Sequence, residues 1–413
     1  NVHESISDFG FRLDGRVDIE DVISRPPVSK LFLLLVGLDG TSRPTVYDDY
    51  NPACIISFMH RRSRITCCFL LFSFLFSCNT QPPQTSSETG FYAYRFDPPA
   101  FIEFSKDFQV VGEIPFSIPA NCGLFNVFSP RVGSFLAIEL SCPNGQTVLL
   151  LDVTTASVTQ PIRDTDSHFL AWTSDGKATY LKVDSLGDPH IARVFTDGVQ
   201  DIVLVNVFTY DLASSPNEGE FTFTFSRGLG QGSELWLAKH DGKIVESLHS
   251  DPYNYISFAR FSPDGSQIAF IKIPDTQTPF TVGELWVMGE DGSNSRKLAD
   301  ADAGHGYAAH WSPAGKRIAF VVRENPEDEE ANQVSNALIS NVYIVDVESG
   351  ALTQVTQLEE GRVETPFWSP DGNTLAFSVV INDRMEVRIA DLTTGEIRSL
   401  ITESACCPAW MRK

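Results

Sequence analysis

Short stretches of alternating apolar and polar residues, each broken by a glycine-bearing turn, recur along most of the chain. The clearest is FSPDGSQIAFI from Phe261, which returns as WSPAGKRIAFVV from Trp311 and WSPDGNTLAFSVV from Trp368. Weaker copies are WTSDGKATYLKV from Trp172 and FSPRVGSFLAIEL from Phe128. Alternation with a period of two predicts a strand, and Ser-Pro-Asp-Gly predicts a tight turn. Each copy therefore predicts a β-hairpin.

The most regular residues of this pattern are suited to the turn itself. Proline presets φ, glycine accepts the positive φ that closes the turn, and the Ser and Asp side chains can accept hydrogen bonds from its free N–H groups. We therefore interpret Asp264 and Asp371 as turn residues rather than as catalytic carboxylates.

A second hairpin follows the first in each repeat, with ELWLAKHDGKIVESL from Glu234, ELWVMGEDGSNSRKL from Glu284, NVYIVDVESGALTQV from Asn341 and EVRIADLTTGEIRSL from Glu386. Four strands with a period of roughly 40 to 55 residues are typical of a β-propeller blade. The SPDGxxIAF hairpin followed by the IYVxDxxxG hairpin resembles the tandem repeat of the TolB-type propeller family, also found in the propeller domains of prolyl oligopeptidase-like enzymes. The resemblance covers the chain from residue 91 and implies an all-β propeller of four-stranded antiparallel blades.

The repeats predict seven blades, with starts near Phe128, Trp172, Phe208, Phe261, Trp311, Trp368 and Trp410. Six blades are the alternative, because the copy near Phe208 has a longer loop, residues 211–220, in place of its first turn. Residues 91–116 read as the last three strands of a blade without its first, and residues 408–411 read as an opening strand. Because an unclosed propeller exposes strand edges, we predict that these two ends pair and close the ring across a domain of residues 91–413.

The N-terminal part shows none of this pattern. We interpret residues 1–58 as a non-native upstream translation or a disordered segment, with a small extra domain as the alternative. Residues 59–78 contain MHRRSR followed by the apolar ITCCFLLFSFLFS, which predicts a signal peptide too short to span a bilayer. Residues 79–90 are polar and predict a disordered tether.

The end of the signal peptide, LFSC at residues 75–78, resembles the bacterial lipobox, which implies diacylation of Cys78. Phe76 is larger than the residue usual in the family, so an ordinary cleaved signal peptide and an uncleaved anchor are the alternatives. In the sorting rule of Gram-negative lipoproteins, the absence of Asp after Cys78 favours the outer membrane. We therefore expect a lipid-anchored protein on the periplasmic or cell-surface side of the envelope.

Charge and cysteine usage narrow the function classes. The formal net charge is −22, which argues against nucleic-acid binding because phosphate requires a basic face. An extracytoplasmic compartment permits disulfides. Cys122 and Cys142 lie about equally far from the turn at residues 131–133, so we predict a disulfide at the open end of that hairpin, with free buried thiols as the alternative. The pairing of Cys406 and Cys407 stays open.

Catalytic motifs are missing from the sequence: GxSxG, the P-loop and HExxH do not occur. We predict no catalytic residue, metal or cofactor. The segment GHGYAAH from Gly304 holds His305 and His310, but two histidines without a third ligand are more typical of structure than of a metal site. We favour a protein-binding or scaffolding module over its alternative, a lyase or hydrolase acting on a polysaccharide or oligosaccharide. The alternative requires His168, His305 and His310 to converge with carboxylates at the central channel.

The expected binding surface follows from blade topology. The loop between the second and third strands and the link to the next blade lie on one face, and the long insertions at residues 272–283 and 323–340 both fall there. For the acidic second insertion alone, tolerated surface growth is the alternative. Links on the same face carry residues suited to recognition: Tyr253, Tyr255, His305, Tyr307, His310, Arg362 and Glu364. We predict that this face, over the blades starting at Phe261, Trp311 and Trp368, binds an envelope protein or glycan, and we expect a monomer.

Overall fold

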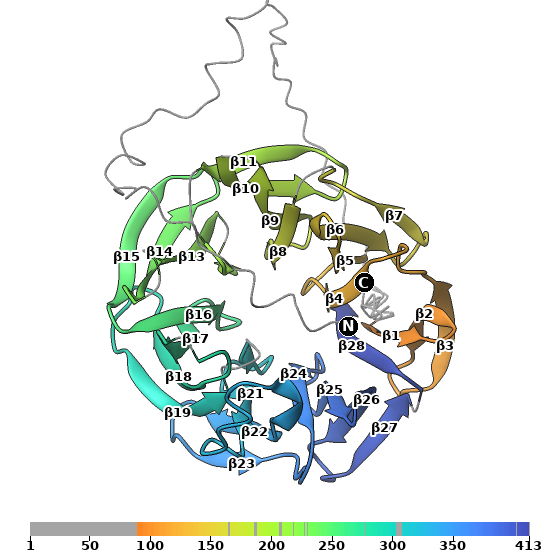
Figure 1. The fold of residues 1–413 in the computed structure, drawn as a ribbon. Coiled ribbons are helices and arrows are strands. Elements are labelled where there is room, and N and C mark those ends of the chain that lie inside the picture. Colours follow the sequence, from red (N-terminus) through yellow and green to blue (C-terminus); the bar gives the residue numbers. More distant parts are fainter. Residues whose placement is uncertain are drawn as a thin grey trace, which may run out of the picture. The chain divides into compact units, whose positions relative to one another are not determined.

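The structure, a computed structural model, describes residues 89–412 except for 164–165, 186–187, 206–208, 218, 227, 229, 277, 303–307 and 402. The predictions for residues 1–88, including Cys78, lie outside these residues. In the described part, the strands form seven four-stranded antiparallel sheets that are arranged as blades around a central axis (Figure 1). The first strand starts at Thr89, slightly earlier than the start predicted at Phe91.

The strands of each blade, from the axis outward, are these: in blade 1, β28 (Ala405–Arg412), β1 (Thr89–Phe96), β2 (Pro99–Phe104) and β3 (Val110–Pro115); in blade 2, β4 (Gly123–Phe128), β5 (Phe135–Cys142), β6 (Gly145–Asp152) and β7 (Ser157–Thr159); in blade 3, β8 (Asp166–Trp172), β9 (Ala178–Ser185), β10 (Asp188–Phe195) and β11 (Gln200–Val205); in blade 4, β12 (Leu212–Ser214), β13 (Glu220–Ser226), β14 (Ser233–Lys239) and β15 (Ile244–Asp251); in blade 5, β16 (Asn254–Phe261), β17 (Gln267–Pro274), β18 (Val282–Gly289) and β19 (Arg296–Asp302); in blade 6, β20 (His310–Trp311), β21 (Arg317–Arg323), β22 (Ser340–Asp346) and β23 (Leu352–Gln354); in blade 7, β24 (Arg362–Trp368), β25 (Thr374–Ile381), β26 (Arg384–Asp391) and β27 (Ile397–Ile401). A 3₁₀ helix, η2 (Ser335–Ala337), lies between β21 and β22. Within the described residues, no helix has the length and apolar character needed to span a membrane.

The ring closes as predicted. The last strand, β28, pairs antiparallel with the first, β1, and places Trp410 opposite Phe91 and Ala409 opposite Tyr92. Blade 1 therefore takes its innermost strand from the C-terminal end of the chain and its other three strands from the N-terminal side of the propeller. The prediction of seven blades is confirmed, and the six-blade alternative is excluded.

Blade 4 corrects one prediction. Its first strand is β12, not a strand around Phe208, and its first turn lies inside the segment that we assigned to a longer loop. The Ser215 N–H donates to the Glu220 carbonyl at 3.0 Å, as the Ser262 N–H donates to the Gln267 carbonyl at 2.8 Å in blade 5. Ser-Pro-Asn with a later glycine, Gly219, thus forms the turn that Ser-Pro-Asp-Gly forms elsewhere, and this spacing hid the repeat.

The Ser-Pro-Asp-Gly turns use their polar side chains internally. In blade 5 the Ser262 hydroxyl donates to Asp264 Oδ1 at 2.6 Å, and the same oxygen accepts from the Ser266 N–H at 3.1 Å. Gly265 has φ +76°, a conformation that favours glycine. These hydrogen bonds hold the pKa of Asp264 below its usual value. The carboxylate is therefore occupied by the turn, in agreement with the structural interpretation.

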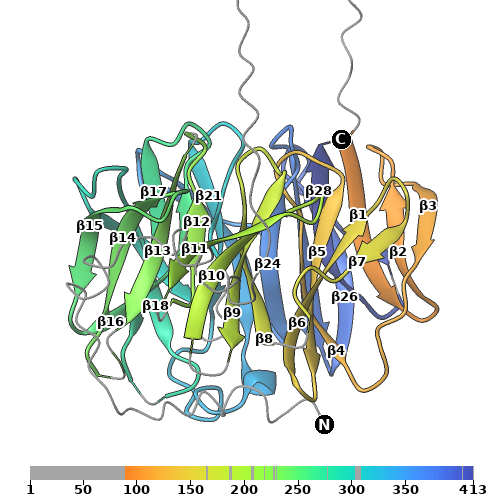
Figure 2. The ribbon, with the colours of Figure 1, turned by 90° about the horizontal axis from the view of Figure 1, so that it is seen from above.

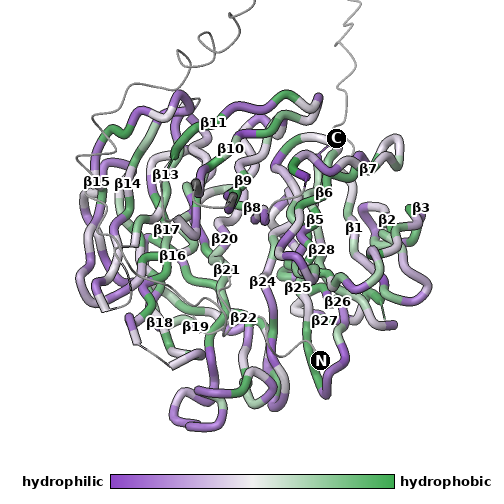
Figure 3. Tube along the Cα trace, turned by 45° about the horizontal axis from the view of Figure 1, so that its top comes forward, coloured by the Kyte–Doolittle hydropathy of each residue, from purple (hydrophilic) through white to green (hydrophobic). Residues whose placement is uncertain are grey.

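The hydrophobic core is divided among the blades. In the described chain, a separate cluster of buried side chains fills the space between each pair of neighbouring blades. Figure 3 shows hydrophobic residues concentrated along the strands, while loops are mostly hydrophilic. Three tryptophans also connect neighbouring blades, because each indole N–H donates at 2.9–3.0 Å to a carbonyl of the preceding first strand: Trp172 to Phe128, Trp311 to Arg260 and Trp368 to His310. This contact explains the aromatic residue before the turn.

Candidate binding face

The predicted face carries the links between blades and the loops between second and third strands; we call it the link face. In the side view of Figure 2, the ends of the blades form two opposite faces. The two long insertions on the link face contact each other through a small core of Phe280, Ala331 and Leu338. The Phe280 N–H also donates to the Asn332 carbonyl at 3.2 Å. The insertions of blades 5 and 6 therefore form one packed unit.

Arg323 holds this unit together. It is only 4% exposed, and its guanidinium donates to the carbonyls of Asn325, Phe280 and Asp328 at 3.1–3.2 Å. A fourth hydrogen bond, of 2.9 Å, reaches Asn332 Oδ1. The acidic side chains that follow are all exposed: Glu324, Glu327, Asp328, Glu329 and Glu330. The insertion thus presents negative charge from an anchored backbone.

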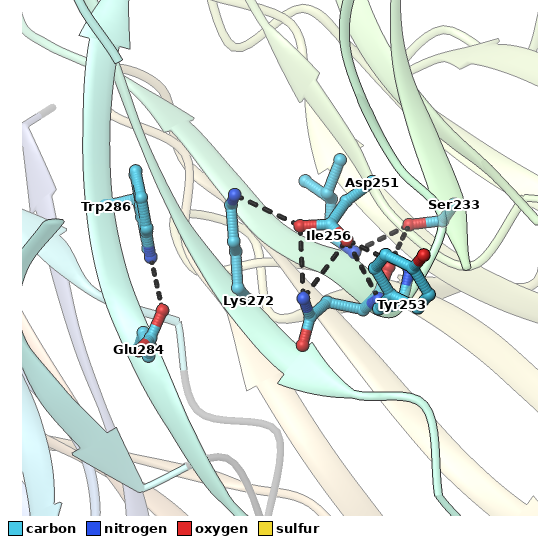
Figure 4. A network of polar contacts seen from close by, with 8 residues as sticks. Ser233, Asp251, Tyr253, Ile256, Lys272, Glu284 and Trp286 are labelled. Carbon is cyan, nitrogen blue, oxygen red and sulfur yellow. Dashed lines mark hydrogen bonds and ion pairs between the residues drawn. The ribbon is translucent and has the colours of Figure 1, made fainter. Parts of the chain in front are cut away.

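Tyr253 forms the most exposed aromatic position of the link face. It lies in the short link between β15 and β16, and its side chain is 80% exposed. Asp251 orders the link, because its Oδ1 accepts hydrogen bonds from the N–H groups of Tyr253 and Asn254 at 3.0 and 3.1 Å (Figure 4). The Asn254 side chain also donates to Asp251. A large aromatic side chain is therefore displayed on a fixed turn.

A lysine from the neighbouring strand completes the network. Lys272 Nζ lies 3.1 Å from Asp251 Oδ2, and both side chains are 11% exposed. The ammonium also lies 3.9 Å from the ring centre of Trp286, whose indole N–H donates to Glu284 at 2.8 Å (Figure 4). Burial alone would raise the pKa of Asp251, but hydrogen bonds from the Tyr253 N–H and from Lys272 outweigh it and lower that pKa. The carboxylate is therefore held in its charged form.

Tyr255 continues the aromatic character beside this corner. Its ring lies edge-on to Tyr210 with centres 6.0 Å apart, and the Tyr210 hydroxyl donates to the Ile256 carbonyl at 2.8 Å. Tyr210 is 40% exposed. Sequence reasoning missed Tyr210 because it precedes the disguised first strand of blade 4, where no repeat signal was visible.

Arg362 and Glu364 belong to a second part of the link face, between blades 6 and 7. A hollow of about 340 Å³ lies there between the β21–β22 loop, the β23–β24 link and the β25–β26 turn. Arg362 Nε lies 3.5 Å from Glu364 Oε1, and Asn336 donates to Asp383 at 2.9 Å across the hollow's lining. Asn336 and Asp383 were not predicted, since only the folded ring brings these loops together.

The histidines do not form one cluster in the described structure. His168 lies on β8 of blade 3 beside Glu139, with 3.2 Å between Nδ1 and Oε1, whereas His310 lies on β20 of blade 6. The His310 ring packs on Phe367 with centres 4.5 Å apart, and burial, with the nearby Arg260 charge, lowers its pKa to about 3. This setting suits packing better than surface recognition. His305 and Tyr307 lie outside the described residues.

The two cysteine pairs occupy different parts of the ring. Cys122 and Cys142 are joined by a disulfide with a sulfur–sulfur distance of 2.02 Å, at the open end of the β4–β5 hairpin. Cys406 and Cys407 are joined to each other on the closing strand β28.

Comparisons with known proteins agree with the architecture. No family model matches the chain. An uncharacterized protein of Agrobacterium fabrum, Atu1656, is 25% identical over 198 residues, which are 44% of this chain and 58% of that protein. Dipeptidyl-peptidase 5 of Porphyromonas gingivalis is 30% identical over 152 residues, 36% of this chain and 21% of the peptidase. The chain thus spans less than two thirds of the length of these relatives.

Solved structures give the same result at lower identity. A puromycin-hydrolyzing peptidase of Mycobacterium tuberculosis matches 76% of this chain and 52% of its own, with 14% identity and a TM-score of 0.54. An oligogalacturonate lyase in complex with manganese matches 75% of this chain and 83% of its own, with 15% identity and a TM-score of 0.50. TolB from Acinetobacter baumannii matches 76% of this chain and 78% of its own, with 16% identity and a TM-score of 0.44. At these identities the shared property is the β-propeller fold.

Proposed function

We propose that this chain is a binding module of the bacterial cell envelope, lipid-anchored through Cys78, that captures a protein partner on the link face. The observation that carries the proposal is Tyr253, 80% exposed yet mounted on a link fixed by the Asp251–Lys272 network. An exposed aromatic on a pre-ordered backbone offers a large contact area and loses little conformational entropy on binding.

The neighbouring features support a surface larger than one residue. The insertions of blades 5 and 6 pack together through Phe280 and Arg323, so this part of the face is also ordered. Its exposed carboxylates favour a partner with basic groups at the rim of the contact.

The alternative of a polysaccharide-acting enzyme required the histidines to converge. Of the three histidines named for it, the two described ones, His168 and His310, lie on different blades. We therefore keep binding as the proposed function.

The test is capture of envelope proteins by the full chain, compared between variants on opposite faces. Tyr253→Ala removes the exposed ring and should weaken capture of the specific partner at least tenfold. The matched control is Val199→Ala, which removes an apolar group that is 60% exposed in the turn between β10 and β11, on the other face. Equal capture by the Tyr253 variant, or loss only in the Val199 variant, would require another surface.

The anchor is tested separately. Cys78→Ser should release the protein from membranes in a lipid-labelling and fractionation assay. Unchanged membrane association would remove lipid anchoring from the proposal and leave the binding face untouched.

A further inference from the structure

A compact set of polar side chains lies on the two inner strands of blade 3, away from the Tyr253 corner. In the β8–β9 ladder Asp166 is opposite Asp184, and His168 is opposite Lys182. Side chains two apart on a strand share one face, so these four residues lie on the same side of the sheet. Asp166 and Asp184 flank the end of the ladder where the chain enters blade 3 from blade 2.

The imidazole of His168 has a defined orientation. Its Nδ1 lies 3.2 Å from Oε1 of Glu139, a residue of blade 2 that is only 3% exposed. When Nδ1–H donates to this carboxylate, the lone pair is on Nε2. Nε2 lies 3.5 Å from Asp166 Oδ1. A histidine fixed by a buried carboxylate through one nitrogen and open at the other is the usual arrangement of a metal-binding histidine.

Three potential ligand atoms converge beside this imidazole. One atom each of Asp166, His168 and Asp184 lie within 4.8 Å of one another. In a tetrahedral zinc site, bond lengths of about 2.0–2.2 Å place neighbouring ligand atoms roughly 3.3 Å apart. The 3.5 Å separation of Nε2 and Asp166 Oδ1 already fits such a site. Small side-chain rotations can bring in Asp184.

The charge balance of the cluster also favours a cation. Two carboxylates directly opposite each other on a ladder repel, and Glu139 adds a third. The fixed positive charge beside them is Lys182, whose Nζ lies 2.9 Å from Asp184 Oδ2. The Gln146 N–H donates to Asp166 at 2.6 Å but carries no full charge. One lysine against three carboxylates leaves negative charge for a dication.

We propose that Asp166, His168 and Asp184 bind a divalent transition-metal ion, with Glu139 orienting His168 from outside the coordination shell. One imidazole and two carboxylates suit Mn²⁺ or Zn²⁺, because the nitrogen ligand disfavours the purely oxygen-coordinated Ca²⁺ and Mg²⁺. Three protein ligands leave further positions for water or a bound molecule. This site is independent of the proposed capture by the link face around Tyr253.

The probe is Mn²⁺, titrated into chelator-treated full-length protein and followed by the electron paramagnetic resonance signal of the free ion. Mn²⁺ is chosen over Zn²⁺ because the chain also carries Cys54, Cys67, Cys68 and Cys78, and thiolates prefer the softer zinc. We expect one saturable site per chain. His168→Gln and Asp184→Asn should each weaken binding at least tenfold, and Glu139→Gln about tenfold.

Two further variants separate metal binding from a purely structural ion network. The control His249→Gln changes another partly buried histidine, on β15 of blade 4, and should leave binding unchanged. Lys182→Met removes the competing cation and should tighten Mn²⁺ binding several-fold. Absence of saturable binding below 1 mM, or equal binding by the wild type and by both Asp184→Asn and Lys182→Met, would overturn the proposal. Circular dichroism of each variant shows whether it remains folded.

Discussion

The Asp251–Lys272 pair should contribute measurably to the stability of the propeller as well as to its link face. Asp251→Asn keeps the size of the side chain but removes its charge. Lys272 would then be left beside Trp286 with its nearest carboxylate gone, in a position where the lysine side chain is 11% exposed. The N–H groups of Tyr253 and Asn254 would also lose a charged acceptor.

The magnitude follows from these contacts. At 3.1 Å and an effective dielectric constant near 20, the gross attraction of the pair is roughly 5 kcal/mol, most of it offset by desolvation. Hydrogen bonds to a charged group contribute about 1.5–3 kcal/mol, and breaking a fully buried pair costs about 3–5 kcal/mol. Because some exposure remains, we expect Asp251→Asn to lower the free energy of unfolding by about 3 kcal/mol.

A double-mutant cycle with Lys272→Met isolates the pair. Urea unfolding of the wild type, both single variants and the double variant gives the coupling energy, which we expect to be about 1–2 kcal/mol. Methionine keeps the packing on Trp286, so the loss of the cation above the ring cancels in the cycle. A coupling below about 0.5 kcal/mol would show that the two groups act independently and would refute this account of the link.

The same pair gives a pH dependence of known sign. The pKa of Asp251 is lowered in the folded protein, so its stabilising contribution is complete above the unfolded value near 3.9 and is lost as the pH falls through the folded value. The stability difference between the wild type and Asp251→Asn should therefore be constant from about pH 5 to 7 and shrink below about pH 4. A difference that grows on acidification would contradict the assigned hydrogen bonds.

Three other perturbations test the contacts that hold the ring and its loops. Trp311→Phe keeps the ring but removes the 2.9 Å hydrogen bond to the Arg260 carbonyl, and urea unfolding should show a loss of about 1 kcal/mol; no loss would mean that the indole contact contributes only packing. Arg323→Met leaves the carbonyls of Phe280, Asn325 and Asp328 without this donor, so limited proteolysis should cut residues 324–339 faster while the blades resist; an unchanged cleavage rate would contradict the anchoring role. Replacing both Cys122 and Cys142 with Ser opens a loop with a sequence separation of 20 and should lower the stability by about 3 kcal/mol in unfolding without reductant; an equal effect of reductant on the double variant and the wild type would argue against a stabilising disulfide.

Features that depend on neighbouring residues in the sequence were predictable. The hydrogen bonds of Ser262, Asp264 and Gly265 all lie within one turn, so the pattern Ser-Pro-Asp-Gly was sufficient to identify both the turn and the structural role of its carboxylate. Ring closure was predictable for a different reason. A propeller leaves no stable place for an unpaired edge, so an incomplete first blade and an additional final strand had to combine.

Contacts between blades were not predictable in the same way. Tyr210 reaches the Ile256 carbonyl across a sequence separation of 46, and Asn336 reaches Asp383 across 47. These partners meet because neighbouring blades stack at a fixed angle, and the repeat pattern does not specify which loop residues then approach each other. His310 shows the opposite error: its place in a link suggested exposure, but the Phe367 ring of the next blade covers it.

The blade 3 cluster shows how a repeat can hold chemistry at positions that its pattern does not mark. In blade 5 the inner-strand position opposite Lys272 is Ile256, whereas in blade 3 the position opposite Lys182 is His168. The two lysines pair with carboxylates of different origin, Asp251 from the preceding blade's last strand and Asp184 from the lysine's own strand. The scaffold requires only that the strands pair and that the spaces between blades are filled, so polar residues near strand ends are free to differ from blade to blade. Function in this fold is therefore to be sought where blades depart from one another, and the Tyr253 corner and the Asp166–His168–Asp184 cluster are two such departures.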